Sequence, residues 1–199
     1  MKGGIVMMSA EPKRIYTMEE YLALERESEV KYEYRNGEVF DMSGGTLYHD
    51  VVADNVRDAL KRELGDKPCR IFSSNRQIKT PALLPYRYAD GSVVCGKIEV
   101  ERFNGCDLLL NPVLLWEVLS PSTEAYDRGD KFTYYKSIPS LKEYLLIAQH
   151  RPHVTQYVKQ NERIWYREEF NDRRENIHSP SLDCNITLDE IYQDVIFPA

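Results

Sequence analysis

The run Val113-Leu114-Leu115-Trp116-Glu117-Val118-Leu119 decides how the rest of the chain is interpreted. It follows Pro112, has the length of a strand and is rich in Val and Leu, which is typical of a central strand covered on both faces. Its one ionisable side chain is Glu117. An ionised carboxylate taken out of water costs several kcal/mol unless it is compensated. The sequence therefore predicts that Glu117 is protonated, paired or bound to a cation.

Helices and strands alternate along the sequence before this run. A capping box, Thr17 with Glu20, begins a helix that we expect from Met18 to about Arg26. Asn36-Gly37 predicts a hairpin over 32–42. After Gly44-Gly45 breaks the chain, apolar residues at every fourth position predict a helix over 46–64. Strands are expected at 69–72, 76–79 and 86–95, and 97–110 is expected as a connection holding at most one short strand.

The sequence after the run continues in the same way. Ser122 or Thr123 is expected to cap a helix from Glu124 to Ile138, which stops at Pro139. Strands are expected at 142–147, 153–159 and 163–167, and a short helix at 187–192. We therefore predict an α/β fold of mixed α+β type, with residues 1–16 as an arm and 17–199 as a single domain.

Composition limits the classes of function. The 199-residue chain has a formal net charge of −6, which argues against a general nucleic-acid coat protein, because non-specific affinity grows with the number of phosphates that Lys and Arg neutralise. Arg70, Arg76 and Lys79 still offer a local phosphate-facing strip. The four cysteines form no CxxC pair, so we expect them to be reduced and the protein to be cytoplasmic. No segment approaches the roughly 18 apolar residues of a membrane span.

Asp90 supplies a second carboxylate that we expect at a strand end, as Glu117 is. Neighbouring carboxylates repel each other unless something positive lies between them. Mg²⁺ accepts carboxylate oxygens and keeps several waters, which leaves positions for a phosphate oxygen and an attacking water. Lys131, in the following helix, could polarise that water or stabilise charge at the phosphorus. This set is what metal-assisted phosphodiester hydrolysis requires.

Each of these residues also has a structural explanation. Asp90-Gly91 is a turn signal. Glu117 could form an ion pair with an Arg or Lys. Lys131 on a helix surface would usually be solvated. From spacing alone, a nuclease is one of several alternatives.

The chain resembles the Uma-two (Uma2) family of restriction-endonuclease-like proteins, within the PD-(D/E)XK nuclease superfamily, from about Thr17 to Trp165. Six short blocks carry the resemblance: Tyr32 to Glu38, His49, Tyr88-Ala89-Asp90, Leu115 to Thr123, Asp127 to Tyr135 and Ile138 to Tyr144. The last three of these blocks are specific in combination.

The resemblance implies a restriction-endonuclease-like core, a mixed β-sheet flanked by helices. It matches Asp90 and Glu117 to the two acidic residues, which would hold Mg²⁺, with Mn²⁺ as a substitute. The lysine of the third motif would fall at Leu119 and is thought to have migrated to the next helix, which points to Lys131. Two residues next to Asp90 depart from the family pattern. The residue before the first acidic residue is usually Pro and here is Ala89, and the residue after it is usually apolar and here is Gly91.

The resemblance also suggests accessory residues and partners. Glu33 matches an additional acidic residue near the metal, with an exposed hairpin carboxylate as the alternative. His49 could contact the scissile phosphate or a carboxylate that does not itself bind the metal, or serve as a capping or interface residue. Gln77 could orient water or form a cross-strand polar pair. DNA is the expected substrate and a homodimer the expected assembly.

We therefore expect a Mg²⁺-dependent DNA endonuclease, with Asp90, Glu117, Lys131 and Glu33 as catalytic residues. One alternative is a catalytically silent nucleic-acid- or protein-binding module that keeps the fold. Another is a metal-independent hydrolase that uses the carboxylate pair as general acid and base.

Overall fold

The structure is a computed structural model that describes residues 14–42, 44–83 and 85–197. The chain divides into two compact units, Met1–Gly44 and Gly45–Ala199. The Gly44-Gly45 pair, expected to break the chain, is where one unit passes into the other. The predicted single domain, residues 17–199, spans both units and stays a prediction.

The first unit contains one helix and one hairpin. Helix α1 (Met18–Glu27) begins with the expected capping box, in which Thr17 and Glu20 exchange hydrogen bonds. Strands β1 (Tyr32–Arg35) and β2 (Glu38–Asp41) pair antiparallel. Their turn needs two positive φ angles, 49° at Asn36 and 92° at Gly37, which Asn and Gly adopt at low cost. The predicted helix and hairpin are both confirmed.

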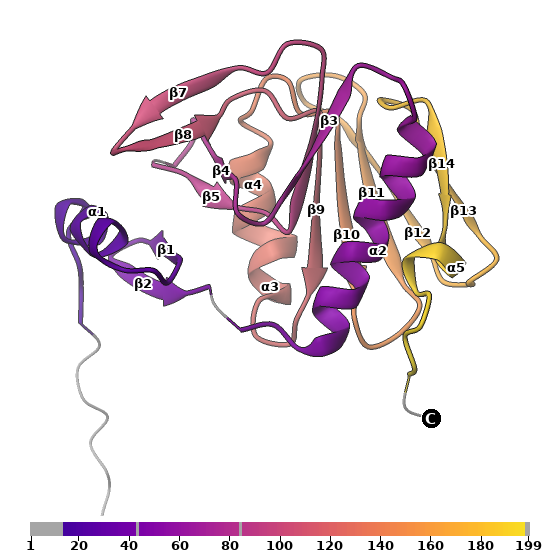
Figure 1. Cartoon of the computed structure of the whole chain (residues 1–199), viewed down its shortest axis with the longest axis horizontal. Coiled ribbons are helices and arrows are strands. Elements are labelled where there is room, and N and C mark those ends of the chain that lie inside the picture. The colour runs from indigo at the N-terminus through magenta and orange to yellow at the C-terminus, as the bar shows by residue number, and fades with distance from the viewer. Residues whose placement is uncertain (1–13, 43, 84, 198–199) are drawn as a thin grey trace, which may run out of the picture. The chain divides into compact units, whose positions relative to one another are not determined.

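The second unit is built on a six-stranded mixed sheet (Figure 1). Its order is β12-β11-β10-β9-β6-β3, in which only β9 and β10 run parallel. The strands are β3 (Cys69–Ser73), β6 (Gly91–Cys95), β9 (Leu114–Leu119), β10 (Glu143–Ala148), β11 (Val154–Lys159) and β12 (Trp165–Phe170). Every residue of β9 is buried, so the central strand expected from the sequence is confirmed.

Helices cover both faces of this sheet (Figure 1). Helix α2 (Leu47–Leu64) packs on the face to which β9 directs Leu114, Trp116 and Val118. A helical segment packs on the opposite face, to which β9 directs Leu115 and Leu119. That segment consists of α3 (Glu124–Tyr126), a π-helical turn η1 (Asp127–Lys131) and α4 (Phe132–Tyr135). Because side chains alternate along a strand, Glu117 points toward the second helical segment.

Two hairpins were not expected from the sequence. Residues 97–110 contain β7 (Val100–Phe103) and β8 (Cys106–Leu109), joined by a positive-φ Asn104-Gly105 turn. With β4 (Gln77–Ile78) and β5 (Arg87–Tyr88) they form a four-stranded sheet, order β5-β4-β8-β7. A separate hairpin, β13 (Asn176–Ser179) and β14 (Cys184–Thr187), precedes α5 (Leu188–Ile191) and packs with it against the α2 side of the core.

Two expected elements are wrong in detail. The single strand over 86–95 is instead two strands in different sheets, β5 and β6, and the chain passes between them at Ala89 and Asp90. The helix expected to reach Ile138 ends at Tyr135 and contains the π-helical turn. Thr123 takes the N-cap position, but no side chain caps the first turn.

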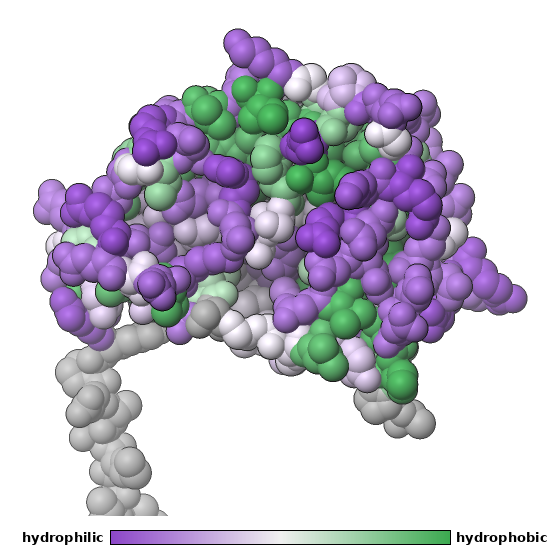
Figure 2. Space-filling view, in the orientation of Figure 1, coloured by the Kyte–Doolittle hydropathy of each residue, from purple (hydrophilic) through white to green (hydrophobic). Residues whose placement is uncertain are grey.

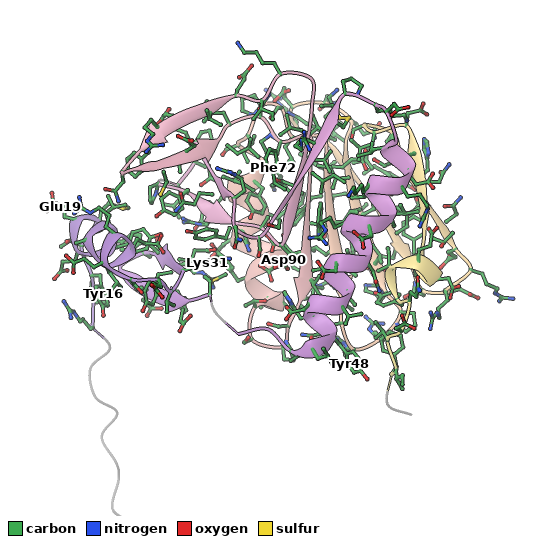
Figure 3. The ribbon with its side chains drawn as sticks, in the orientation of Figure 1. Tyr16, Glu19, Lys31, Tyr48, Phe72 and Asp90 are labelled. Carbon is green, nitrogen blue, oxygen red and sulfur yellow. A yellow bond between two sulfur atoms is a disulfide. The ribbon has the colours of Figure 1, made fainter. Side chains whose placement is uncertain are left out.

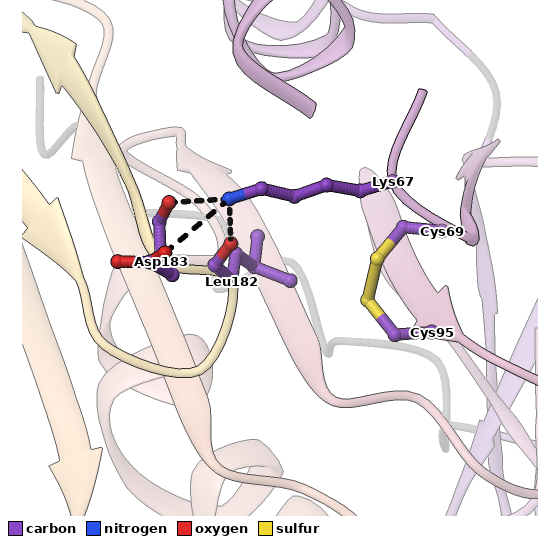
Figure 4. The surroundings of a disulfide bond; sticks show 5 residues. All are labelled: Lys67, Cys69, Cys95, Leu182 and Asp183. Atoms are coloured by element: carbon purple, nitrogen blue, oxygen red, sulfur yellow. Dashed lines mark hydrogen bonds and ion pairs between the residues drawn. A yellow bond between two sulfur atoms is a disulfide. The ribbon is translucent and has the colours of Figure 1, made fainter. Parts of the chain in front are cut away.

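The expectation of four reduced cysteines is wrong for Cys69 and Cys95, which form a disulfide (Figure 4). They lie opposite each other in the antiparallel β3–β6 pair, with Cα atoms 4.0 Å apart. Their sequence separation of 26 residues gives no sign of this pairing, which depends on strand register. Beside the disulfide, Lys67 Nζ donates to the carbonyl oxygens of Leu182 and Asp183.

The face of the protein seen in Figure 2 is mostly hydrophilic. An apolar patch lies near the start of α2 and the C-terminal segment, where Leu47 and Ile196 are exposed. No helix in the described ranges is both long and apolar enough to cross a lipid bilayer.

Candidate active site

Asp90 and Glu117 lie side by side where β6 begins against β9. Gly91 is the register partner of Trp116 in this antiparallel pair. Asp90, which precedes Gly91, is therefore a neighbour of Glu117, which follows Trp116. The backbone N–H of Asp90 donates to Glu117 Oε2 (3.3 Å), and the backbone N–H of Val118 donates to Asp90 Oδ2 (2.7 Å). Figure 3 places Asp90 in the second unit, beside α2, where it contacts His49. The two strands thus bring together the carboxylates that the sequence predicted as a pair.

Lys131 completes this arrangement from the helical segment. Its Nζ lies 2.8 Å from Glu117 Oε1 and 3.3 Å from Asp127 Oδ1. The side chains of all three residues are 3–4% exposed. A buried ammonium between two carboxylates is held far more firmly than a surface lysine, since little water competes for it. The solvated alternative for Lys131 is therefore excluded.

Asp127 and Tyr135 also belong to this cluster, and sequence reasoning missed both. Tyr135 donates its hydroxyl to Glu117 Oε1 at 2.9 Å. Asp127, Lys131 and Tyr135 recur at every fourth position, which places them on one helix face. That spacing was the available signal. The segment includes a π-helical turn, a feature that is rare and often found at functional sites.

The protonation of Glu117 reflects this environment. Burial raises the pKa of Glu117 well above the ordinary carboxyl range. The charge of Lys131 opposes this shift, whereas the charges of Asp127 and Asp90 add to it. Glu117 and Asp127 share one lysine, and the charge of Asp90 adds to theirs, so additional positive charge would favour the ionised form of Glu117.

His49 joins Asp90 from the first turn of α2. Its Nε2 lies 3.3 Å from Asp90 Oδ2 and its Nδ1 lies 3.3 Å from Asp50 Oδ1. Burial lowers the pKa of His49, but the hydrogen bonds and charges of Asp90 and Asp50 outweigh it, so the pKa is raised overall. Thr46, not His49, caps the helix. His49 thus contacts the carboxylates of Asp90 and Asp50, and its role at the site stays a prediction.

Gly91 departs from the family pattern for a reason that the packing shows. A Cβ atom on Gly91 would lie 1.9 Å from Cζ2 of Trp116, closer than any side chain could come. The indole ring therefore occupies the space that an apolar side chain at position 91 would fill. Asp90 is held by this packing and by its hydrogen bond from Val118.

The remaining predicted residues have other contacts in the structure. Gln77 donates to the Tyr88 hydroxyl (2.8 Å) across the β4–β5 pair, which is the cross-strand alternative. Glu33 lies on β1 in the first unit, where it accepts from Arg35 Nε at 3.1 Å, and its role near a metal stays a prediction. Of the expected phosphate-facing strip, Arg76 donates to the Asp107 carbonyl and Lys79 pairs with Glu101.

The donor set around Asp90 suits a hard divalent cation. Asp90 Oδ1 has no hydrogen-bond partner in the part of the chain that the structure describes, and Glu117 Oε2 has only its 3.3 Å contact with the Asp90 N–H. Among the described residues, no group of three or more His, Cys, Asp and Glu side chains is arranged to hold a metal. Two carboxylates are, however, what Mg²⁺ commonly takes from a protein, because water and phosphate complete its shell.

Comparison with known proteins identifies a family whose model matches most of this chain. The Uma2 family, described as "Putative restriction endonuclease", matches residues 18–189. Two relatives come from Synechocystis sp. The uncharacterized protein slr1290 is 31% identical over 179 residues, covering 90% of this chain and 92% of its own length. The uncharacterized protein sll1609 is 34% identical over 161 residues, covering 80% of this chain and 89% of its own.

Comparison with a solved structure shows which fold the chain has. The crystal structure of "a putative nuclease belonging to DUF820" from Anabaena variabilis is similar, with a TM-score of 0.71 at 19% identity. The match covers 90% of this chain and 99% of that one. It confirms the predicted fold class, a mixed α+β nuclease fold. Because the family match spans most of the sequence, the chain belongs to the Uma2 family of restriction-endonuclease-like proteins.

Proposed function

We propose that this protein is a Mg²⁺-dependent endonuclease that hydrolyses phosphodiester bonds in DNA. The observation that carries the proposal is the meeting of Asp90 and Glu117 at the β6–β9 junction with Lys131 2.8 Å from Glu117. Family membership supports the class of reaction. A buried cluster with more carboxylates than cations is costly to stability, and ionisable groups perturbed in this way are typical of functional sites.

Each residue has a distinct role in this proposal. Asp90 and Glu117 would hold the Mg²⁺, which when bound supplies a Lewis acid for a phosphate oxygen and lowers the pKa of bound water. Lys131 keeps a fixed positive charge at the carboxylate pair, where it stabilises the negative charge that develops on the phosphate. Asp127 and Tyr135 position Lys131 and Glu117 through the contacts described above.

Plasmid nicking tests the proposal directly. We expect purified protein to convert supercoiled plasmid to open circles with Mg²⁺ or Mn²⁺, and chelation to stop the reaction. Asp90→Asn, Glu117→Gln and Lys131→Met should each reduce the rate at least about 100-fold. The exposed Glu168→Gln on β12 is the matched control and should cut normally. Nicking that persists unchanged in Glu117→Gln would come from another source and would defeat the proposal.

The ion pair between Lys131 and Glu117 supports a second candidate function. Glu117 Oε1 already accepts from Lys131 and Tyr135, so the fold could persist as a metal-free binding module. Calorimetric titration with Mn²⁺ separates the candidates. The endonuclease should show a site that disappears in Asp90→Asn, whereas the binding module should show no heat at that site. The metal-independent acid–base hydrolase predicts activity on glycosides in the presence of chelator.

The proposed homodimer is carried over from the nuclease superfamily, whose members often cut two strands with two subunits. Light scattering behind size-exclusion chromatography measures the mass in solution. A value near twice 23.3 kDa supports the dimer, and a value near the chain mass contradicts it.

A further inference from the structure

The N-terminus of α2 lies beside the candidate active site. Thr46 is the N-cap, and its hydroxyl accepts from the backbone N–H of His49 at 3.2 Å. His49 Nε2 in turn lies 3.3 Å from Asp90 Oδ2. Because one turn of helix rises about 5.4 Å, the first residue of α2 lies less than one turn from the residue that contacts Asp90.

Two backbone N–H groups at this terminus have no acceptor. The first N–H groups of an α-helix lack an intrahelical partner. The cap satisfies that of His49, and Asp50 donates to the Thr46 carbonyl at 3.2 Å. Those of Leu47 and Tyr48 find no acceptor among the residues that the structure describes. They lie at the positive end of the dipole of an 18-residue helix, so they offer an anion both donors and positive potential.

A buried amide reaches the same place from the sheet. Gln149 follows β10, is 7% exposed, and accepts a hydrogen bond at Oε1 from the Thr46 hydroxyl. Its Nε2 donates to no residue in the described ranges. That nitrogen is not sealed from solvent, so a ligand can reach it. Since Oε1 and Nε2 belong to one planar amide, the unpartnered amide nitrogen lies close to the helix N-cap.

The end of β9 extends this surface. Strands β9 and β10 run parallel and end at register partners, so Ser120 and Gln149, which follow them, are neighbours. Both come two residues after side chains that face α2, Val118 and Ile147, and alternation directs them to that side as well. Figure 1 shows α2 beginning at the end of the sheet where β9 finishes. The carboxyl ends of parallel strands are a common place for ligands in open α/β sheets.

We propose that the N-terminus of α2 and Gln149 bind a phosphate of the DNA backbone adjacent to the scissile one. This inference rests on the proposed nuclease function. Backbone N–H groups, helix N-termini and Gln side chains are common donors to DNA phosphates, and they fix the position of the duplex without reading its sequence. The site holds the strand beside Asp90 and Glu117, in a chain whose formal net charge of −6 gives little overall attraction to DNA.

One acid lies close to the proposed phosphate site. Asp50 is the acidic residue of the first turn of α2. Its carboxylate is 71% exposed and lies 3.3 Å from His49 Nδ1. Water and salt screen an exposed charge, so Asp50 opposes phosphate binding only weakly.

The first experiment removes a single N–H group from the site. Variants are made in the Glu117→Gln protein, and the anisotropy of a short dye-labelled duplex gives the Kd. Leu47→Pro deletes one free N–H at the first helical position, where Pro is favoured, and Thr46 already has the extended backbone (ψ 158°) that a following Pro requires. Leu47→Ala loses the same exposed side chain but keeps the N–H. We expect Leu47→Pro to bind about tenfold more weakly than Leu47→Ala.

The second experiment separates phosphate binding by Gln149 from its contact with Thr46. Gln149→Glu keeps an oxygen for the Thr46 hydroxyl, but it replaces the amide nitrogen by negative charge. We expect binding at least about tenfold weaker. Gln160→Glu, exposed after β11, adds the same charge elsewhere and should bind like the Glu117→Gln parent. If Gln149 serves only to hold Thr46, Gln149→Glu will behave like this control. Circular dichroism establishes that each variant is folded.

The outcomes separate this proposal from the one it rests on. Equal Kd values for Leu47→Pro and Leu47→Ala, a parental Kd for Gln149→Glu, or a parent that binds no duplex would overturn the phosphate site. Plasmid nicking by the wild-type protein tests the nuclease by itself. Nicking together with unchanged binding in these variants removes only this inference. The expected losses of binding without nicking leave a protein that holds the DNA backbone and does not cleave it.

Discussion

Lys131 Nζ and Glu117 Oε1 lie 2.8 Å apart inside the protein, between a sheet strand and the helical segment that follows it. Both side chains are almost completely buried. Removing one partner of such a pair leaves a charge without compensation, which typically costs about 3–5 kcal/mol. The pair is therefore central to the stability of the site as well as to its proposed chemistry.

A double-mutant cycle should reveal this coupling. We expect Lys131→Met to lower the free energy of unfolding by about 3–5 kcal/mol, and Glu117→Gln/Lys131→Met to be less destabilised than the sum of its single variants by about 1–3 kcal/mol. Urea unfolding followed by circular dichroism gives these values. The more exposed pair Lys79–Glu101 is the control and should couple by less than about 1 kcal/mol. Strict additivity at 117 and 131 would contradict the buried ion pair.

Asp127 should matter for cleavage although it contacts only Lys131 in the site. Asp127→Asn keeps the shape of the side chain but removes the second anion at Lys131 Nζ. Changing a residue that orients a catalytic group typically slows the reaction about 10–100-fold, so we expect nicking to slow by about that factor. Asp130→Asn, exposed on the same turn, should leave the rate unchanged. Equal nicking rates for the two variants would show that Asp127 does not contribute to cleavage.

His49 should titrate above its ordinary range in the metal-free protein. Burial lowers its pKa, but Asp90 and Asp50 raise it by more. A pKa raised by folding means that this group stabilises the protein fully below its unfolded pKa of about 6.5. That stabilisation is lost as the pH rises through the folded value.

Proton NMR titration of the four histidines, with His49→Gln to assign the resonance, measures this pKa. Asp90→Asn should lower the pKa of His49, because the hydrogen bond and the charge of Asp90 raise it more than those of Asp50 do. A pKa of His49 that does not respond to Asp90→Asn would show that the 3.3 Å contact does not form in solution.

Local patterns in the sequence predict much of this fold. The Asn36-Gly37 hairpin and the capping boxes act within a few residues, so their physics is visible in the sequence. Asn104-Gly105 carries the same hairpin signal, so the β7–β8 hairpin was predictable in the same way. The turn signal at Asp90-Gly91 marks the break between β5 and β6. No local pattern shows that these two strands join different sheets.

The candidate site was only partly predictable for a related reason. Asp90, Glu117 and Lys131 were found from a carboxylate in an apolar strand and from family motifs. The contact of His49 with Asp90 depends on how α2 crosses the sheet, which no local pattern fixes. The role of Gly91 depends on Trp116 from the neighbouring strand, and the disulfide depends on the β3–β6 register.

The Cys69–Cys95 disulfide should contribute measurable stability. It closes a 26-residue separation between two strands, and cross-links of this span typically stabilise a protein by about 2–4 kcal/mol. Cys95→Ser should therefore lower the free energy of unfolding by that amount under non-reducing conditions. Thiol alkylation of the unfolded protein should modify two cysteines without reductant and four with it. Modification of all four without reductant would show that the bond does not form.

Gly91→Ala tests the packing that holds Asp90. The new Cβ would lie 1.9 Å from the Trp116 ring, so the ring or the strand must move, and overpacking of this kind costs about 1–3 kcal/mol or more. Gly129→Ala is the matched control, because a Cβ at Gly129 meets nothing within 4 Å and Ala favours the helix. It should leave stability unchanged or raise it slightly. Trp116→Leu should recover part of the loss in the Gly91→Ala background, because the smaller side chain vacates the space above residue 91. If Gly91→Ala and Gly129→Ala unfold at the same urea concentration, the indole ring does not rest on Gly91, and the explanation for this departure from the family pattern fails.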